Sequence, residues 1–301
     1  MANAQHAPTP RTSPVHRVAG RAVVALETTL LAHGLPPGEG LPLAEELEEI
    51  IKKHKARPAT VGVLKGIPIV GMSRDEISTL LALANVEKAN TANLGPLIYQ
   101  RKSAATTVSS TVLLAARAGV RVMATGGLGG VHNKLNHRLD ISADLAALAR
   151  HPVTIVSSGV KTVLDVASTR ELLETLGVPV IGFRTDRFPA FYLVESDAGV
   201  DATFDDPADI ARFARRHMAS TGSGVLIVQP VPGDHAVEPA SWHDWLERAQ
   251  RSTAAVHGRA TTPALLSAIH EISGGRTLQA NLALVRQNAD LAARIAVEMA
   301  R

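Results

Sequence analysis

Short apolar runs alternate with stretches of helical periodicity along this chain. The runs are rich in Val, Ile, Leu and Ala, and we expect strands at Ala22–Leu26, Thr60–Leu64, Val120–Ala124, Val153–Ser157, Val178–Phe183 and Val225–Gln229. Near-continuous apolar runs are typical of strands that are covered on both faces. Helices are expected at Leu43–His54, Ser109–Ala118, Ala143–Arg150, Thr169–Leu176 and Pro207–Ser220. The alternation predicts an α/β protein with three α/β/α layers, in which helices cover both faces of a central mixed, largely parallel sheet.

The C-terminal segment, from about Pro239 onward, is predicted to be mostly helical. Apolar residues recur there at spacings of three and four, on one stripe of a long helix: Leu278, Leu282, Val285, Ala289, Ala292, Ile295 and Met299. Such a stripe could cover the sheet or pack against another subunit.

The domain organisation is predicted to be simple. No linker rich in Pro, Gly or Ser divides the chain, and no internal repeat is present. Residues Met1 to Val18 contain three prolines and lack the apolar core of a signal peptide. We therefore expect a flexible N-terminal tail over residues 1–18, which could order against a neighbouring subunit, and a single catalytic domain over residues 19–301.

Composition narrows the classes of partner. Hydrophobic residues make up 46% of the 301 positions and charged residues 20%, which is typical of a globular enzyme with a substantial core. A net charge of +3 and an aromatic content of 3% argue against a nucleic-acid surface. No apolar run approaches the roughly 20 residues that span a bilayer. The absence of cysteine excludes disulfides and thiol chemistry and is typical of a cytoplasmic protein.

The stretch from Thr125 to Asp144 concentrates groups that suit a phosphate and metal site. Its glycines, at 126, 127, 129 and 130, follow a predicted strand but do not have the spacing of a dinucleotide fingerprint. They could form a phosphate cradle of backbone amides or a plain tight turn. Oxygen and imidazole donors favour Mg²⁺ or Mn²⁺ over Zn²⁺, and the candidate ligands are His132, His137, Asp140 and Asp144. The alternative is a pair of surface histidines with an Asp near a helix start.

Two further candidates lie at predicted strand ends. Glu27 ends the first apolar run, where ligands of open α/β sheets bind. Apolar neighbours could raise its pKa enough for acid–base work near neutral pH, or the residue could simply cap a turn. Lys161 follows a strand end in a loop of small residues and could act as an amine nucleophile, or it could be a surface residue that opens a helix.

The hydroxyl-rich segment 104–111 opens a predicted helix. Its amides and hydroxyls could hold an anion. Simple N-capping by Ser109 or Ser110 is the alternative.

Taken in order, these segments resemble the pseudouridine-5′-phosphate glycosidase family, also called indigoidine synthase A-like. The similarity extends from about Ala22 to Met299. It is carried by Val-Ala-Leu-Glu-Thr-Thr-Leu-Leu-Ala-His-Gly-Leu-Pro (24–36), Ala-Thr-Gly-Gly-Leu-Gly-Gly-Val-His (124–132), Ser-Gly-Val-Lys-Thr-Val-Leu-Asp (158–165) and by segments 105–111, 140–145, 173–183, 188–191, 262–266 and 281–285.

The resemblance implies an α/β/α homotrimer with a divalent metal, usually Mn²⁺. It implies chemistry on the C–C glycosidic bond between a planar acceptor, uracil, and ribose 5-phosphate, through an iminium at Lys161. Lys161 would be the nucleophile, Glu27 the proton donor and Asp140 the metal ligand. The family pattern assigns substrate contacts to Lys88, Val108, Thr125, His132, Ser142, Asp144 and Asn281.

Two loops depart from the family pattern near the substrate. Ala-Asn-Thr-Ala-Asn-Leu follows Lys88 at 89–94, and Asn133-Lys134, with Asn136 and Arg138 nearby, follow His132. These departures concern the acceptor more than the sugar phosphate. One alternative within the family is a C-glycosynthase that attaches ribose 5-phosphate to an aromatic polyketide in antibiotic biosynthesis. An alternative of another class is a non-catalytic partner subunit.

Overall fold

A single mixed sheet organises the chain. The computed structural model describes residues 15–18, 20–132, 139–254 and 261–301. Within them, an 11-stranded sheet has the order β1 (Val15–His16), β4 (Ile67–Val70), β3 (Arg57–Leu64), β2 (Val23–Leu26), β7 (Val122–Ala124), β8 (Thr154–Ser157), β11 (Val225–Val228), β9 (Val180–Phe183) and β10 (Ala202–Phe204), with β6 (Ala104–Thr106) and β5 (Glu87–Ala89) branching from β3. β3 is antiparallel to β4 and β6, and the other pairs are parallel. The sheet is therefore mixed and largely parallel, as predicted.

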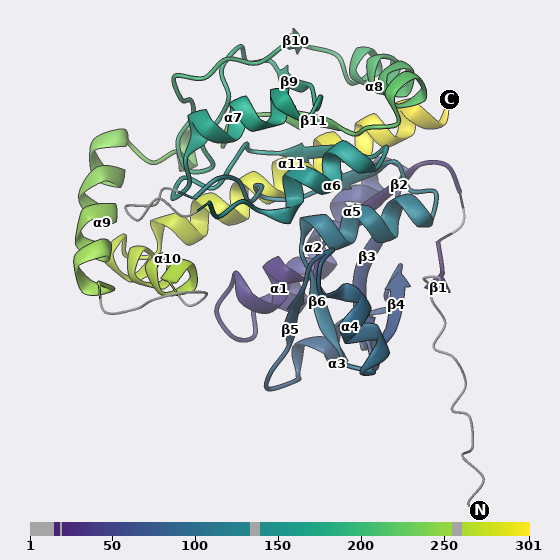
Figure 1. Ribbon diagram of the computed structural model, residues 1–301, viewed down its shortest axis with the longest axis horizontal. Coiled ribbons are helices and arrows are strands. Elements are labelled where there is room, and N and C mark those ends of the chain that lie inside the picture. The colour runs from purple at the N-terminus through teal and green to yellow at the C-terminus, as the bar shows by residue number, and fades with distance from the viewer. Residues whose placement is uncertain (1–14, 19, 133–138, 255–260) are drawn as a thin grey trace, which may run out of the picture.

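Helices cover both faces of the sheet (Figure 1). One core joins strand residues to α2 (Gly40–Lys53), α8 (Pro207–Thr221) and α11 (Arg276–Ala300). The other core joins the alternate strand residues to α5 (Val108–Arg117), α6 (Ala143–Arg150) and α7 (Val166–Thr175). In β2, for example, Val24 and Leu26 enter the first core while Val23 and Ala25 enter the second. This alternation follows from the two-residue period of a strand and confirms the three-layer prediction.

The predicted elements are all present, and the ones that were not predicted are short. The six expected strands and five expected helices correspond to β2, β3, β7, β8, β9, β11, α2, α5, α6, α7 and α8. The shorter additional helices are α1 (Thr29–His33), α3 (Arg74–Leu81) and α4 (Leu94–Tyr99). β4 is reached from β3 through Lys65 and Gly66, both with positive φ, a tight two-residue hairpin turn. The Lys-Gly pair between two apolar runs was a usable signal for this hairpin.

The C-terminal segment is helical, as predicted, but its last helix is more deeply buried than one apolar stripe requires. It comprises α9 (Pro239–Ser252), α10 (Thr261–Ile272) and α11. Besides stripe residues such as Val285 and Ile295, the buried set in α11 includes Ala280, Leu284 and Leu291. The helix contacts the strands β2, β7 and β8, so it covers the sheet, and it also contacts the helices α2 and α8. No helix in the described part of the chain has the length and apolarity to cross a bilayer.

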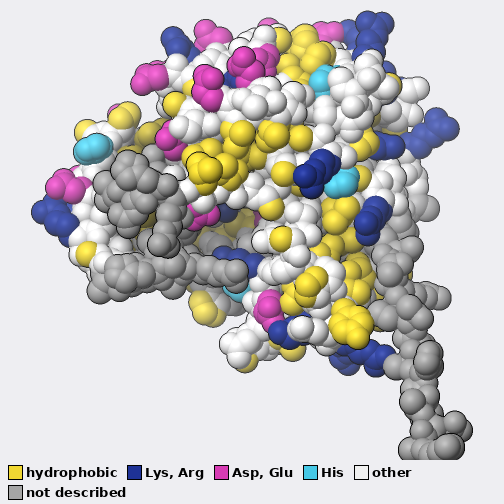
Figure 2. All heavy atoms as spheres, viewed as in Figure 1, with side chains coloured by type: hydrophobic (Ala, Val, Ile, Leu, Met, Phe, Trp, Pro, Cys, Tyr) yellow, Lys and Arg dark blue, Asp and Glu magenta, His cyan; other side chains and the backbone are white. Residues whose placement is uncertain are grey.

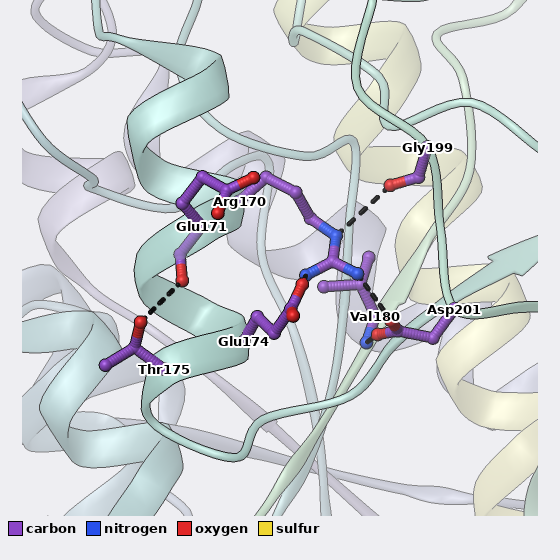
Figure 3. Close-up of polar contacts among 7 residues, drawn as sticks. All are labelled: Arg170, Glu171, Glu174, Thr175, Val180, Gly199 and Asp201. Atoms are coloured by element: carbon purple, nitrogen blue, oxygen red, sulfur yellow. Dashed lines mark hydrogen bonds and ion pairs between the residues drawn. The ribbon is translucent and has the colours of Figure 1, made fainter.

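An arginine network fixes the long connection between β9 and β10. Arg170 of α7 donates Nε–H to the Gly199 carbonyl at 3.1 Å and pairs with the Asp201 carboxylate (Figure 3). The other carboxylate oxygen of Asp201 accepts the Val180 amide at 2.7 Å. The C-terminal end of the connection is thereby held against α7 and β9. The same connection carries Phe191, which lies against the site described below.

The residues expected to form a tail are described only from residue 15. Val15 and His16 form β1, which pairs in parallel with β4, and the Arg17 amide donates to the Val70 carbonyl at 3.1 Å. The Arg17 guanidinium also pairs with Glu76 at 2.7 Å. Residues 1–14 lie outside the described part of the chain.

Candidate active site

Three neighbouring parallel strands end side by side, and a polar residue follows each. Glu27 follows β2, Thr125 follows β7, and Lys161 lies shortly after β8. β7 pairs with both β2 and β8, so their carboxyl ends share one edge of the sheet. The Lys161 amide donates to the Leu128 carbonyl at 3.2 Å, which ties the β8 loop to the β7 loop. Ligands of open α/β sheets bind at this position.

Glu27 has the electrostatic character of a proton donor. Burial of its carboxyl raises the pKa from 4.5 to about 7, against the lowering effects of the nearby Lys161 charge and of the hydrogen bond from Thr125. Thr125 Oγ1 donates to Glu27 Oε1 at 2.5 Å. Asp144 raises the pKa further, and Lys88 lowers it. A carboxyl that titrates near neutrality can deliver a proton, so this environment suits the predicted role, which stays a prediction.

Lys88 reaches the site from the branch of the sheet formed by β5 and β6. Loss of hydration and then the Lys161 charge lower its pKa. Asn93 Nδ2 donates to the Lys88 carbonyl at 2.9 Å, so the unusual Asn-Thr-Ala-Asn turn supports the lysine backbone. His33, the last residue of α1, was not predicted; partial burial and then Lys88 lower its pKa. Figure 2 shows a hollow beside the grey residues, with Lys or Arg and His side chains at its margin. A cationic surrounding of this kind suits an anionic ligand.

Asp144 is a connecting residue. Its Oδ1 accepts the Ser109 amide at the start of α5 and its Oδ2 accepts the Gly129 amide, both at 2.9 Å. The side chain is 7% exposed. Asp144 itself lies in α6, and Ser142 caps this helix by accepting the Asp144 amide at 3.2 Å. Because its two carboxylate oxygens accept these two amides, Asp144 joins the glycine-rich loop to the helix that begins at Val108.

Internal bonds already use much of the backbone of the glycine-rich loop. The Leu128 amide donates to Gly159, the Gly129 amide to Asp144, and the Val131 amide to Thr169 Oγ1, each at 2.9 Å. The His132 amide donates to the Asp140 carbonyl at 2.9 Å. These four amides are therefore engaged within the protein, and a phosphate could be bound only by other amides of the loop.

Position 127 must be a glycine because the Phe191 ring packs directly against it. A Cβ there would meet the Phe191 ring at 2.5 and 2.9 Å. We expect Gly127→Ala to lower the free energy of unfolding by about 1–3 kcal/mol, since an overpacked core must shift. Urea unfolding checks this, with Gly95→Ala as a control because a Cβ at Gly95 meets nothing within 4 Å. Adding Phe191→Leu should recover part of the loss, and equal midpoints for the Gly127 variant and the wild type would contradict the expected clash.

Two asparagines of α11 face the same loop. Asn281 is 8% exposed, and within the described residues its Oδ1 is buried without a hydrogen-bond partner. A Cβ at Gly126 would lie 3.2 Å from that oxygen, which places Asn281 beside the glycine-rich loop. A buried acceptor without a partner is uncommon and suits a residue that meets a ligand. Asn288, which was not predicted, is fully buried and bonds the same loop from below.

The predicted metal site is described only in part. His137 lies outside the described residues. Among the residues that the structure does describe, no three His, Asp or Glu side chains form a group that could hold a metal ion. Asp140 is exposed, and its carbonyl accepts the His132 amide. A single exposed carboxylate suits a hard divalent ion that keeps several of its waters.

The comparison with known families decides the assignment of the chain. Residues 16–298 match the sequence profile described as indigoidine synthase A like protein. The chain belongs to this family. Named relatives of this indigoidine synthase A-like chain are pseudouridine-5′-phosphate glycosidases. The protein of Symbiobacterium thermophilum is 44% identical over 93% of both chains, and that of Arabidopsis thaliana is 39% identical over 94% of this chain and 87% of its own.

Two solved structures have the same fold as this chain. An indigoidine synthase A-like protein from Thermotoga maritima superposes with a TM-score of 0.87 at 35% identity, covering 96% of this chain and 97% of its own. The prealnumycin C-glycosynthase AlnA, solved in complex with ribulose 5-phosphate, has a TM-score of 0.85 at 33% identity over 92% and 91% of the two chains. The family resemblance stated from sequence is therefore confirmed.

Proposed function

We propose that this protein is a pseudouridine-5′-phosphate glycosidase, which converts pseudouridine 5′-phosphate and water into uracil and ribose 5-phosphate. The observation that carries the proposal is the placement of Glu27, whose pKa is raised to about 7, within the electrostatic reach of Lys161. Full-length similarity to glycosidases at 39–44% identity supports the same reaction.

The reaction must overcome a poor carbon leaving group. The C1–O4 bond of the ribose ring breaks as the amine of Lys161 forms a C–N bond at C1, and the proton that the amine loses leaves O4 as a hydroxyl group. Protonation of uracil C5 by Glu27 then allows the C1–C5 bond to break, while the nitrogen lone pair forms the iminium C=N bond. Water hydrolyses the iminium, releasing ribose 5-phosphate and the free lysine. Glu27 must be protonated for the bond-breaking step, so we expect kcat to fall as the pH rises above about 7.

The remaining predicted residues are assigned to substrate binding. Lys88 adds positive charge near Lys161, which favours an anionic sugar phosphate. Asn281 supplies a buried acceptor, its Oδ1, that has no partner among the residues that the structure describes, and Thr125 donates its hydroxyl to Glu27. Contacts from Val108, His132, Ser142 and Asp144 complete the proposal; Asp144 would act chiefly by holding the loops that face the substrate.

A divalent ion, Mn²⁺, is part of the proposal. Asp140 would hold it through its exposed carboxylate. When bound, such an ion would offset negative charge on the substrate. Assembly into a homotrimer stays a prediction from the resemblance, to be measured by light scattering of the full chain.

A cleavage assay tests the reaction directly. Purified protein with Mn²⁺ and pseudouridine 5′-phosphate should release uracil and ribose 5-phosphate, detected by mass spectrometry. In the reverse direction, ribose 5-phosphate and uracil should give pseudouridine 5′-phosphate. We expect chelation by EDTA to abolish turnover and Mn²⁺ to restore it, while the melting curve of the chelated protein shows whether the fold survives.

Each other outcome points to a different function. Borohydride reduction in the presence of ribose 5-phosphate should trap the sugar on Lys161 as a stable secondary amine. A trapped adduct without any uracil product would favour a C-glycosynthase that uses a different planar acceptor. The structural neighbour AlnA is named as a C-glycosynthase. If neither a product nor an adduct forms, the hypothesis of a non-catalytic partner subunit is favoured.

A further inference from the structure

A single buried carboxamide of α11 bonds the loops that follow neighbouring strands. Asn288, in the middle of α11, is 0% exposed. Its Nδ2 donates to the Thr125 carbonyl at 2.9 Å, to the Gly126 carbonyl at 3.3 Å and to Ser158 Oγ at 3.2 Å. These acceptors belong to the loops that follow β7 and β8, so one side chain holds both loops against the helix.

The acceptor end of the same carboxamide reaches a third loop. Asn288 Oδ1 accepts from Gln229 Nε2 at 2.9 Å, and Gln229 directly follows β11. Gln229 is 2% exposed, and its Oε1 accepts from Gln287 Nε2 at 3.2 Å. β7, β8 and β11 are consecutive strands in the sheet. Asn288 therefore bonds to the residues that follow three adjacent strands at the centre of the sheet.

The joined loops carry the groups that the proposed reaction needs. Thr125, whose carbonyl Asn288 holds, donates its hydroxyl to Glu27. Ser158 leads in three residues to Lys161 and also bonds the loop after β7, through its amide and the Gly126 carbonyl at 2.9 Å. A shift of either loop would therefore move the proton donor relative to the amine.

We propose that Asn288 is a positioning residue: through Thr125 and Ser158 it fixes the relative placement of Glu27 and Lys161 without touching the substrate. This inference rests on the proposed function of the site. A carboxamide suits the position because it presents donors to three oxygen acceptors and an acceptor to Gln229. An Asp at 288 would turn an oxygen toward those acceptors, and a Leu would leave them buried without partners.

The test compares Asn288→Leu and Asn288→Asp with a matched control, Ile295→Ala. Ile295 is also 0% exposed and lies two turns further along α11, in the same core but away from these loops. With pseudouridine 5′-phosphate as substrate, both Asn288 variants should lose on the order of 10²-fold in kcat, the usual effect of a small misplacement of reacting groups. KM should change far less. The control should lower the melting temperature and keep kcat.

The pH profile separates positioning from a general loss of structure. Glu27 is faced by Lys161, Thr125, Asp144 and Lys88, and only the Thr125 bond depends directly on Asn288. Loss of that bond should raise the pKa of Glu27, so the alkaline decline of kcat should move to higher pH in Asn288→Leu and stay in place in Ile295→Ala. Unchanged kcat and pH profile in the folded Asn288 variants would overturn the proposal.

Hydrogen exchange gives a readout that does not need turnover. Peptides covering 125–131 and 158–161 should exchange faster in Asn288→Leu than in the wild type, and at the wild-type rate in Ile295→Ala. If the wild type cleaves nothing, the proposed function has failed, while exchange still decides whether Asn288 orders these loops. Equal exchange in all three proteins would overturn its positioning role regardless of activity.

Discussion

Replacement of Lys161 by Ala should lower turnover of pseudouridine 5′-phosphate by on the order of 10⁴-fold or more, because removal of a covalent nucleophile leaves only binding and electrostatic effects. Lys161→Arg should be equally inactive, since a guanidinium keeps the charge but stays protonated and cannot form the C–N bond. Both should retain the melting behaviour of a folded protein. Turnover in a stopped uracil-release assay and borohydride trapping of ribose 5-phosphate measure the two steps separately.

The pair of variants also separates nucleophilic from electrostatic roles. The charge of Lys161 lowers the pKa of Glu27, so Lys161→Ala should raise that pKa while Lys161→Arg should change it less. Lys53→Ala, an exposed residue of α2, is the control and should keep full activity. Substantial turnover by Lys161→Arg would show that the residue acts only through its charge and would exclude the iminium.

The sequence was sufficient for the elements that form the centre of the fold. Strands such as β8 and β11 are rich in β-branched residues, are buried on both faces and lie between clear helical patterns, so local composition identifies them. The branch formed by β5 and β6 was not predicted, because each strand has three residues and exists only through pairing that leads back to the long strand β3. Pairing of that kind depends on tertiary context, which short segments do not encode on their own.

The candidate site residues could be proposed one by one from the sequence, but their arrangement in space could not. Glu27 and Lys161 were identified by their positions after strands, whereas their proximity depends on a sheet order that places β7 between β2 and β8. Asn288 was missed because an Asn in a predicted helix is usually a solvent-exposed residue without a specific role. The spacing between Asn281 and Asn288 was a usable signal: seven residues are two helical turns, so both lie on one face, among residues that are otherwise apolar.

The pH dependence of stability offers a test of Glu27 that does not depend on catalysis. Its pKa is raised from 4.5 to about 7 in the folded protein, so the folded state binds more protons than the unfolded state between these values. Stability therefore falls as the pH rises through this window. Once the carboxyl is ionised, above pH 7, the loss amounts to about 3 kcal/mol at most.

Glu27→Gln should remove this penalty while keeping an oxygen that can accept the Thr125 hydroxyl. We expect the variant to exceed the wild type in free energy of unfolding by about 1–3 kcal/mol at pH 8.5 and to match it near pH 4.5. Its turnover should be lower by on the order of 10²–10⁴-fold, because the amide has no proton to deliver to the leaving carbon. Urea unfolding at fixed protein concentration measures the first effect, with Glu49→Gln, an exposed residue of α2, as control. A variant that is inactive yet more stable only at alkaline pH would show a proton donor held at the expense of stability; an equal difference at both pH values would mean that the carboxyl of Glu27 is not kept protonated by its surroundings.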